Sequence, residues 1–219
     1  MTAIIFDMDG VLIDSQPLHY EIDMRVIKAC NTPASLSMVT PYTGISNADR
    51  WPQYKAALSL SPTVEQLIEM SEAMMREVFQ ETEIVAITGI PALLQGIKAL
   101  GLPTAVASSS SHELIQMVLN RTGIAQYFDA CISGEDVKIG KPNPDIYLRA
   151  ASVLGLPPEN CIAVEDAPPG ILAAKNANLT CIAYKNPNTY GQIFTHADYV
   201  VEKYDECLPI IKTIMERNQ

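Results

Sequence analysis

The sequence predicts an α/β fold in which a doubly wound parallel sheet carries a small inserted helical domain. Over most of the chain, short apolar, β-branched runs alternate with segments of helical periodicity, which is the pattern of a parallel sheet covered by helices. The alternation is absent from residues 15–82, where we find helical stretches and no convincing strand. This stretch is far longer than the roughly 2–6 residues that ordinarily connect a strand to a helix. We therefore expect a helical insertion after the first strand.

Six apolar runs are expected to form the strands of the sheet. Each run is short and bounded by turn-forming or polar residues, as a buried strand of a parallel sheet would be. The runs are 3–7 (AIIFD), 103–108 (PTAVAS), 130–133 (ACIS), 161–166 (CIAVED), 180–184 (TCIAY) and 198–201 (DYVV).

The segments between these strands are expected to be helices. They span residues 90–100, 111–122, 143–154, 168–177 and 205–217. Residues that tolerate positive φ, which helix C-termini favour, stand just past the periodic segments. These residues are Gly101, Gly123, Gly155 and Asn178. At the start of the segment NPDIYLRAASVLG, we expect Asn143 as the N-cap and Pro144 at the first helical position.

The expected organisation is a core domain of residues 1–14 and 83–219 with a helical domain of residues 15–82 inserted into it. Breaks near NTPAS, TPYTG and SLSPT divide the insertion into separate helices. The 219 residues suffice for one core domain with a smaller insertion.

The composition is that of an acidic globular protein. Hydrophobic residues make up 48% of the chain and charged residues 18%, the formal net charge is −10, and the sequence pI is about 4.7. This negative charge disfavours a nucleic-acid partner. A small anionic substrate would instead need clustered lysine or arginine side chains, or a metal ion held by carboxylates.

The sequence also bears on cellular location. No apolar run approaches the roughly 18–20 residues that a membrane span requires, and no charged-then-apolar signal segment opens the chain. The five cysteines are odd in number, widely spaced and without a CxxC pair, which favours reduced thiols over a disulfide or zinc framework. We expect a cytoplasmic protein that does not associate with membranes.

Polar motifs follow four of the predicted strands. Parallel strands place their carboxyl ends at one edge of the sheet, where ligands bind in open α/β folds. The motifs are DMDG (7–10), SSSS (108–111), GKPNPD (140–145) and VEDAPPG (164–170). Each alone has an ordinary explanation, as a solvated turn, a loop or the start of a helix. Their equivalent positions favour one shared site.

The two carboxylates of DMDG suit phosphoryl transfer. Asp7 can attack phosphorus and form an aspartyl-phosphate, while Asp9 can protonate the leaving alkoxide and later take a proton from water. Like charges at close range push two pKa values apart, as these two roles require. Glu165 and Asp166 bring further carboxylates that can bind Mg²⁺, which neutralises the cluster together with the phosphate.

Two further polar residues complete this predicted site. The Ser108 hydroxyl and the Lys141 ammonium can hold the remaining phosphoryl oxygens, Lys141 as a point charge near the nucleophile. The expected ligand is therefore a small phosphorylated metabolite.

The order DMDGVL, hydrophobic-then-Ser108, Lys141-Pro142 and EDAPPG resembles the haloacid dehalogenase (HAD) superfamily. The likeness is to its β-phosphoglucomutase-like branch of sugar phosphatases and mutases. The resemblance implies a Rossmann-like doubly wound core and a small α-helical cap that closes over the site and contributes to substrate recognition. The acidic residue at position 9 argues against the dehalogenases, which lack it.

The resemblance assigns roles at matching positions. Asp7 matches the nucleophile, and Asp9 matches the acid/base that also offers its backbone carbonyl to Mg²⁺. Asp166, with Glu165 beside it, matches the metal-binding pair. The residues that match phosphate-binding positions, or that we expect to line the same loop, are Ser108, Ser109, Ser110 and Lys141.

The segment TGISNADR resembles the substrate-specificity loop of this branch, and we expect Gly44 and Asn47 to contact substrate. In β-phosphoglucomutases an arginine of this loop grips the second phosphate of a bisphosphate, and Asn47 stands at that position here. Arg50 follows three residues later and can replace that arginine only with a different geometry.

Three further positions bear on substrate choice. His19 has the spacing of a mutase histidine that is coupled to the acid/base, although a helix-surface or interdomain histidine explains it equally well. Arg76 matches the approximate position of a cap lysine and is a candidate phosphate contact, with an exposed helix charge as the simpler alternative. Ser111 and His112 replace a phosphate-contacting Lys-Asn stretch of the mutases.

These departures favour a phosphatase over a mutase, because a mutase must hold two phosphates and exclude water from the aspartyl-phosphate. We expect a Mg²⁺-dependent phosphatase for a sugar or polyol phosphate, with a β-phosphoglucomutase-type mutase as the alternative. A non-enzymatic protein that binds a phosphorylated ligand is a third hypothesis. By analogy with the family, the chain is expected to be a monomer.

Overall fold

The computed structural model describes residues 1–217 and contains a six-stranded, fully parallel sheet in the order β3-β2-β1-β4-β5-β6. Every predicted strand is present, with ends within one residue of those expected. The strands are β1 (Ala3–Phe6), β2 (Thr104–Ser108), β3 (Ala130–Ser133), β4 (Cys161–Glu165), β5 (Thr180–Tyr184) and β6 (Tyr199–Val201). The predicted α/β class with a doubly wound sheet is confirmed.

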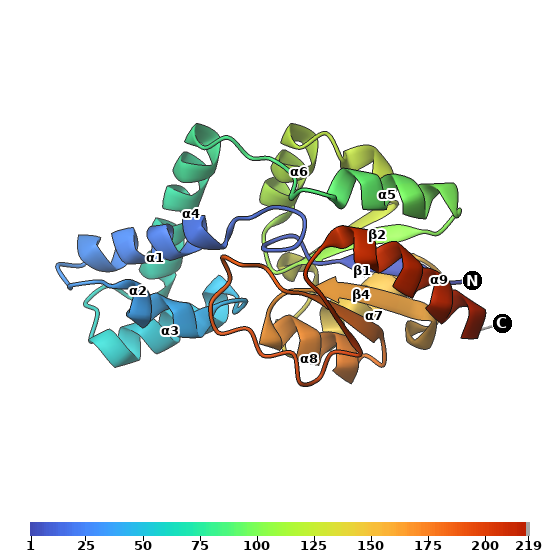
Figure 1. Cartoon of the computed structure of the whole chain (residues 1–219). Helices are drawn as coiled ribbons and strands as arrows, with labels where there is room; N and C mark the ends of the chain where they lie inside the picture. Colours follow the sequence, from blue (N-terminus) through green and yellow to red (C-terminus); the bar gives the residue numbers. More distant parts are fainter. Residues whose placement is uncertain (218–219) are drawn as a thin grey trace.

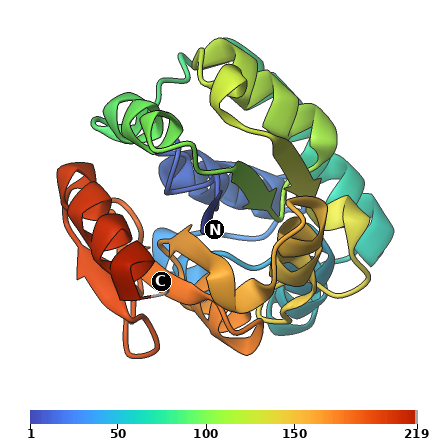
Figure 2. The same cartoon turned by 90° about the vertical axis from the view of Figure 1, so that its right-hand side faces the viewer.

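The helices of the core lie in two layers, one on each face of the sheet (Figure 1). Helices α5 (Ile90–Ala99), α6 (His112–Arg121) and α9 (Cys207–Arg217) cover one face, and α7 (Asp145–Val153) and α8 (Pro168–Asn176) cover the other. Figure 2 shows these layers from the side on which both termini lie.

The strand sequences explain this layering. In β1, Ile4 and Phe6 point to the α5, α6 and α9 layer while Ala3 and Ile5 point to the other, because side chains alternate along a strand. The face toward α7 and α8 is rich in alanine, which lets those helices pack close to the sheet. Both faces are buried, so the strands read as continuous apolar runs.

The helix ends of the core lie within two residues of those expected. Gly101, Gly123, Gly155 and Asn178 have positive φ, as expected past helix C-termini. The N-cap prediction for α7 was wrong: the cap is Pro144, and α7 begins at Asp145. The amide groups of Asn143 instead bond to the Gly140 carbonyl in the preceding turn.

Residues 16–81, all within the described part of the chain, form helices and no strand. They are α1 (Gln16–Ala29), α2 (Leu36–Val39), η1 (Thr40–Tyr42), α3 (Asn47–Leu58) and α4 (Val64–Glu81). This helical segment has an apolar cluster of its own, around the fully buried Trp51. It lies beyond the carboxyl ends of the strands, at the end of the sheet opposite to the termini (Figure 1). Domain limits at residues 14 and 83 stay a prediction.

Two other sequence expectations concern thiols and membranes. All five cysteines are free, as expected for reduced thiols. Among residues 1–217, no helix is both long enough and apolar enough to cross a membrane.

Candidate active site

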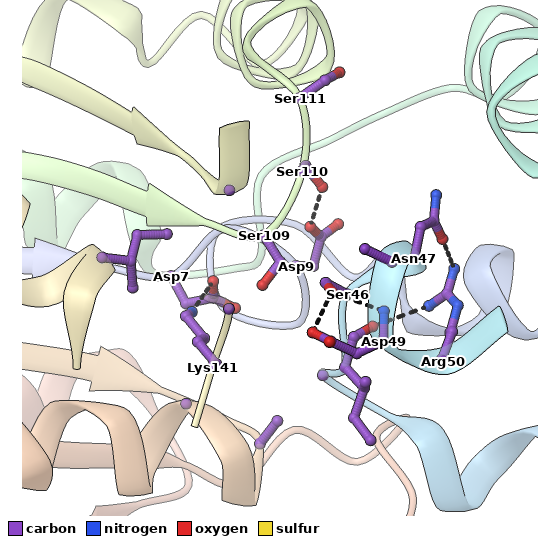
Figure 3. A pocket seen from close by; sticks show the side chains of 18 of the residues that line it. Asp7, Asp9, Ser46, Asn47, Asp49, Arg50, Ser109, Ser110, Ser111 and Lys141 are labelled. Atoms are coloured by element: carbon purple, nitrogen blue, oxygen red, sulfur yellow. Dashed lines mark hydrogen bonds and ion pairs between the residues drawn. The ribbon is translucent and has the colours of Figure 1, made fainter. Parts of the chain in front are cut away.

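The four predicted motifs meet at the carboxyl edge of the sheet. Asp7 follows β1, Ser108 ends β2, and Glu165 ends β4, so the three central strands deliver one motif each. Lys141 reaches the same place from the loop after β3. Asp7, Lys141 and Glu165 line a cavity of about 360 Å³ between the sheet edge and the helical segment (Figure 3). That volume suits a small metabolite.

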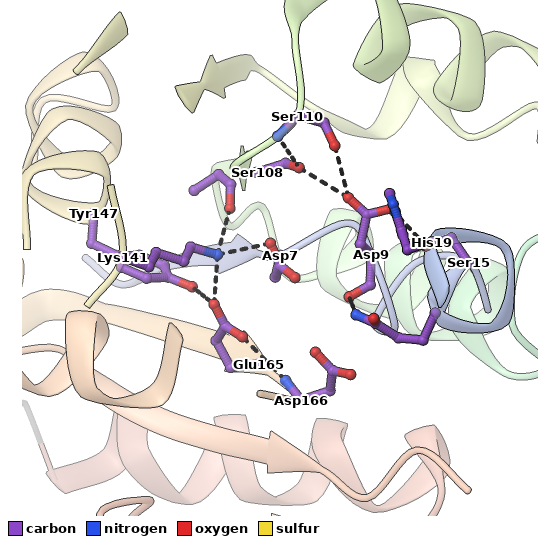
Figure 4. Close-up of polar contacts among 12 residues, drawn as sticks. Asp7, Asp9, Ser15, His19, Ser108, Ser110, Lys141, Tyr147, Glu165 and Asp166 are labelled. Carbon is purple, nitrogen blue, oxygen red and sulfur yellow. Dashed lines mark hydrogen bonds and ion pairs between the residues drawn. The ribbon is translucent and has the colours of Figure 1, made fainter. Parts of the chain in front are cut away.

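Lys141 is the centre of a buried ion-pair network (Figure 4). Its Nζ donates to Asp7 Oδ1 at 2.8 Å, to Glu165 Oε1 at 2.7 Å and to the Ala107 carbonyl at 3.1 Å. The Tyr147 hydroxyl also donates to Glu165 Oε1, at 2.5 Å. Glu165 therefore holds Lys141 in place, and Lys141 in turn fixes the orientation of the Asp7 carboxylate.

The electrostatics of this network are unbalanced, because one lysine faces more than one carboxylate. Burial raises the pKa of Asp7 to about 8, against the attraction of Lys141 and with further repulsion from Glu165 and Asp9. Burial alone would lower the pKa of Lys141, but the ion pairs with Asp7 and Glu165 hold that pKa above its usual value. In the absence of a further cation, the Asp7 carboxyl therefore tends to keep its proton at neutral pH.

Asp9 lies in a different environment and faces α1 (Figure 4). Its Oδ1 accepts hydrogen bonds from Ser15 Oγ at 2.6 Å and from His19 Nε2 at 2.8 Å, and its Oδ2 accepts one from Ser110 Oγ at 2.9 Å. Burial works against the charged form, but the His19 ring and these hydrogen bonds outweigh it and lower the pKa of Asp9. The two neighbouring carboxylates thus have pKa values displaced in opposite directions.

The lowered pKa of Asp9 bears on the two proton-transfer roles that the sequence predicts for it. A carboxylate with a lowered pKa is the form that takes a proton from water, which is the second task expected of Asp9. To protonate a leaving alkoxide, Asp9 must first gain a proton and give up part of its hydrogen bonding to His19 and Ser15.

A divalent cation fits the acidic end of the cavity. Oxygens of Asp7, Glu165 and Asp166 lie within 4.8 Å of one another, and all three residues are buried. Asp166 Oδ1 is buried without a hydrogen-bond partner among the described residues. Carboxylate oxygens are the donors that Mg²⁺ prefers, and a cation would satisfy this oxygen. The Asp9 carboxylate lies outside this group.

Burial and the carboxylates of Asp7 and Glu165 raise the pKa of Asp166 well above its ordinary value. Glu165 Oε1 is already satisfied by Lys141 and Tyr147. Asp7 and Asp166 are therefore the side chains best placed to hold the cation.

Two glycines make room for these carboxylates. A Cβ on Gly10, where φ is +82°, would lie 2.1 Å from Asp166 Oδ2. A Cβ on Gly170 would lie 1.9 Å from Glu165 Oε1. Neither acid could keep its position beside a larger residue.

The serine run divides into buried and cavity-lining parts. Ser109 and Ser110, which we expected in the phosphate loop, line the cavity, and so does Ser111. Ser108 is 0% exposed and lies beneath them. Its Oγ accepts a hydrogen bond from the Ser110 amide at 3.1 Å and donates one to Asp9 Oδ2 at 3.4 Å. In this structure Ser108 therefore supports the serine loop and the Asp9 carboxylate.

Of the expected residues in the helical segment, His19, Gly44 and Asn47 line the cavity. The structure does not place Arg76 there: its side chain is exposed, and it is absent from the cavity lining. The cavity face of α4 carries Ile68, Glu72 and Met75, at helical spacing.

Arg50 lines the cavity, but its guanidinium is held by other residues of the helical segment. It is 7% exposed, its Nη2 lies 3.2 Å from Asp23 Oδ1, and the same nitrogen donates to Asn47 Oδ1 at 2.6 Å (Figure 3). An arginine has donors only, so the Asn47 amide must turn its oxygen to Arg50 and offer its NH₂ group elsewhere. Arg50 thus supports the loop that Asn47 occupies.

Sequence reasoning missed several residues that hold the site together. Tyr147 reads as one apolar position of an amphipathic helix, although its hydroxyl reaches Glu165. Thr189 and Gln192, from the loop after β5, hydrogen-bond to Asp166. The spacing of polar residues in NPNTYGQ is a weak signal, and only the fold shows which motif the loop meets.

The sheet topology, the inserted helices and the acidic cavity together define a hydrolase of the α/β class with a carboxylate-centred site. The chain belongs to the haloacid dehalogenase-like hydrolase family, whose model matches residues 4–184. The expected membership is confirmed, and a solved structure of a putative β-phosphoglucomutase from Thermotoga maritima is 29% identical with a TM-score of 0.72, covering 97% of this chain and 99% of that one, in keeping with the β-phosphoglucomutase-like branch.

Relatives of known name cover almost the whole chain. The phosphorylated carbohydrates phosphatase of Thermotoga maritima is 29% identical over 217 residues, which is 98% of this chain and 100% of that protein. Hexitol phosphatase B of Escherichia coli strain K12 is 31% identical over 84% of either chain. Among solved structures, CbbY of Rhodobacter sphaeroides in complex with phosphate superposes with a TM-score of 0.84 at 26% identity, covering 94% of this chain and 96% of that one.

Proposed function

We propose that the protein is a Mg²⁺-dependent phosphatase that hydrolyses a small phosphorylated carbohydrate, such as a sugar or polyol phosphate. One observation carries the proposal: the buried Asp7 carboxylate, oriented by Lys141, lies beside the unpartnered oxygen of Asp166 in a cavity of metabolite size. The names of the relatives, which are phosphatases of phosphorylated carbohydrates and hexitols, support the same class of substrate.

In the first step, a carboxylate oxygen of Asp7 attacks phosphorus, and an aspartyl-phosphate forms as the ester P–O bond breaks. The leaving alkoxide takes a proton from Asp9. In the second step, Asp9 takes a proton from water, which attacks phosphorus and releases inorganic phosphate and the Asp7 carboxylate. Lys141 offsets negative charge beside the reacting group throughout.

Mg²⁺, when bound, would offset the charge of the phosphate and of the surrounding carboxylates. Asp7 and Asp166 would hold it, with the Asp9 backbone carbonyl as a further ligand implied by the family. The helical segment would serve as the cap, with His19 linking α1 to Asp9 through the contact at 2.8 Å.

The cavity favours a monophosphate over a bisphosphate. Arg50, the nearest arginine of the specificity loop, is buried and bonded to Asp23 and Asn47, so it cannot grip a second phosphate without breaking an ion pair. Asn47 can instead donate its NH₂ group to a hydroxyl. We therefore favour hydrolysis over the mutase reaction. We also propose that the protein is a monomer and that it is cytoplasmic.

The test is a panel of sugar, polyol and bisphosphate substrates with Mg²⁺, in which phosphate release and product identity are both recorded. We expect inorganic phosphate without isomerisation, and at least a thousandfold loss in Asp7→Asn (on the order of the loss of a catalytic nucleophile). Asp205→Asn, at an exposed position, is the matched control. Hydrolysis retained by folded Asp7→Asn would refute the mechanism, and isomerisation of a hexose 1-phosphate would favour the mutase.

A further inference from the structure

The loop between β5 and β6 is tied to the active site by three side chains spaced three residues apart. Asn186 Nδ2 donates to the Gly10 carbonyl at 2.9 Å, Thr189 Oγ1 donates to Asp166 Oδ2 at 2.6 Å, and Gln192 Nε2 donates to the Asp166 carbonyl at 2.9 Å. We call residues 186–192 the bracket loop. It holds the first and the last motif of the site at once.

The bracket loop fixes which oxygen of Asp166 faces the other acids. Thr189 is 7% exposed and occupies Oδ2 with its only proton. Oδ1 is left buried and without a partner, in the group of oxygens that Asp166 shares with Asp7 and Glu165. Without Thr189, both oxygens of Asp166 would be unsatisfied, and rotation of the carboxylate would lose its main restraint.

The bracket loop is also bonded to the helical segment. Figure 1 shows it as the orange-red loop that extends from the sheet toward α1 and α3. The Tyr190 amide donates to Tyr20 Oη at 3.3 Å, Tyr20 Oη lies 2.8 Å from Thr43 Oγ1, and Thr43 Oγ1 donates to the Thr40 carbonyl at 2.7 Å. Since the Thr43 proton is used on Thr40, Tyr20 must donate to Thr43, and its oxygen is free to accept from Tyr190.

We propose that Thr189 is a positioning residue for the cation ligand Asp166, and that Tyr20 steadies Thr189 from the helical segment. The proposal rests on the Mg²⁺ site of the proposed function. Residues that hydrogen-bond to metal ligands fix ligand orientation, and their loss typically weakens metal affinity about 10–100-fold. The bracket loop thereby makes cation affinity depend on a contact with the helical segment.

In the experiment, the metal-free protein is titrated with Mg²⁺ and the binding is measured by isothermal titration calorimetry. Thr189→Val, which keeps the shape and removes the hydroxyl, is expected to weaken the Mg²⁺ Kd about 10–100-fold. Thr189→Ser, which restores a hydroxyl, is expected to bind within about threefold of the wild type, a difference of less than 1 kcal/mol. The melting temperature of each variant is recorded alongside.

Thr104→Val is the matched control, because the Thr104 hydroxyl donates to the Tyr127 carbonyl far from the acidic cluster. It is expected to lower the melting temperature and leave the Mg²⁺ Kd unchanged. A purely structural role for Thr189 would give the same pattern. Wild-type Mg²⁺ affinity in folded Thr189→Val would therefore overturn the proposal.

Tyr20→Phe tests the connection to the helical segment. It is expected to weaken Mg²⁺ binding less than Thr189→Val, and to have no further effect in the Thr189→Val background, because it acts through that residue. Additive effects would overturn the part assigned to Tyr20. Absence of Mg²⁺ binding by the wild type would refute the proposed metal site itself, and this proposal with it, which separates the two failures.

Discussion

The molecule contains two buried ion-pair networks, one around Lys141 in the core and one around Arg50 in the helical segment. In the core, Lys141 is bonded to Asp7 and Glu165, with Asp166 close by. In the helical segment, Arg50 faces the single carboxylate of Asp23, to which the Tyr54 hydroxyl also donates. The second network balances one positive charge with one negative charge, whereas the first has excess negative charge and opens on the cavity.

The difference separates a structural ion pair from a reactive one. In the balanced pair, burial raises the pKa of Asp23 and its Oδ1 has no hydrogen-bond partner among residues 1–217, but the Arg50 charge 3.2 Å away offsets part of this desolvation. In the unbalanced cluster, repulsion from neighbouring carboxylates adds to burial in raising the pKa values of Asp7 and Asp166, and Asp166 Oδ1 has neither a hydrogen-bond partner among residues 1–217 nor an ion pair. Only the latter gains from a cation or a phosphoryl group, so we expect the two networks to respond differently to substitution.

Among the substitutions that test this comparison, Lys141→Met is expected to have the largest effect, and that effect is on activity. The substitution keeps the length of the side chain and removes the one cation that is bonded to Asp7 among residues 1–217. We expect kcat/KM for a sugar phosphate to fall about 10²–10³-fold, the usual loss for one preorganised electrostatic group. Steady-state kinetics at saturating Mg²⁺ measure this. Activity within tenfold of the wild type would show that the core network is structural as well.

The next effect is on stability, in Arg50→Met. Asp23 would be left as an uncompensated buried charge, which costs about 3–5 kcal/mol of unfolding free energy. Urea denaturation followed by circular dichroism measures this loss, and Asp23→Asn in the same chain should recover part of it. The control is Arg25→Met, whose exposed pair with Glu21 is worth about 1 kcal/mol or less. Equal losses in the two arginine variants would contradict the comparison.

A smaller effect links Mg²⁺ binding to pH. In the metal-free protein the pKa of Asp7 is raised to about 8, so below that pH the carboxyl holds a proton that a bound cation displaces. Affinity should therefore rise with pH between about 6 and 8, by at most about tenfold per unit for each proton released, and the raised pKa of Asp166 acts in the same direction. Calorimetry in buffers of different ionisation enthalpy measures the proton release. Affinity that falls as pH rises from 6 to 8 would contradict the raised pKa.

The smallest effect is expected from Arg76→Ala. Arg76 is exposed on α4 and lies outside the cavity lining, so KM for sugar phosphates should change by less than about twofold, within the range of an ordinary surface substitution. Kinetics on the substrate panel measure this. A severalfold rise in KM would instead place Arg76 at the substrate, as its position in the sequence had suggested.

Local patterns were enough to predict the sheet and the meeting of the four motifs. The strands are short apolar runs, and the carboxyl ends of parallel strands share an edge, so Asp7, Lys141 and Asp166 were placed without long-range information. The N-cap of α7 was missed because Asn143 is used in the preceding turn.

Contacts between distant residues were not predictable from one sequence. The contact of Ser15 with Asp9 was not expected, and the contact of His19 with Asp9 was one of two alternatives, since both depend on how α1 packs. The burial of Ser108 and the contact of Thr189 with Asp166 depend likewise on tertiary packing. Helical periodicity could not predict whether Arg76 lines the cavity, because the position of the whole helix determines which face of α4 meets the cavity.

The glycines at positions 10 and 170 have a consequence for how the sequence tolerates variation. Any side chain at Gly10 would occupy the place of Asp166 Oδ2, and any at Gly170 would occupy the place of the Glu165 carboxylate. In a saturation mutagenesis screen, both positions should therefore be as intolerant as Asp7 and Asp9, although glycine has no side chain to offer to a reaction. A map of mutational tolerance would therefore show low tolerance at the glycines that contact the acidic cluster as well as at its acidic residues.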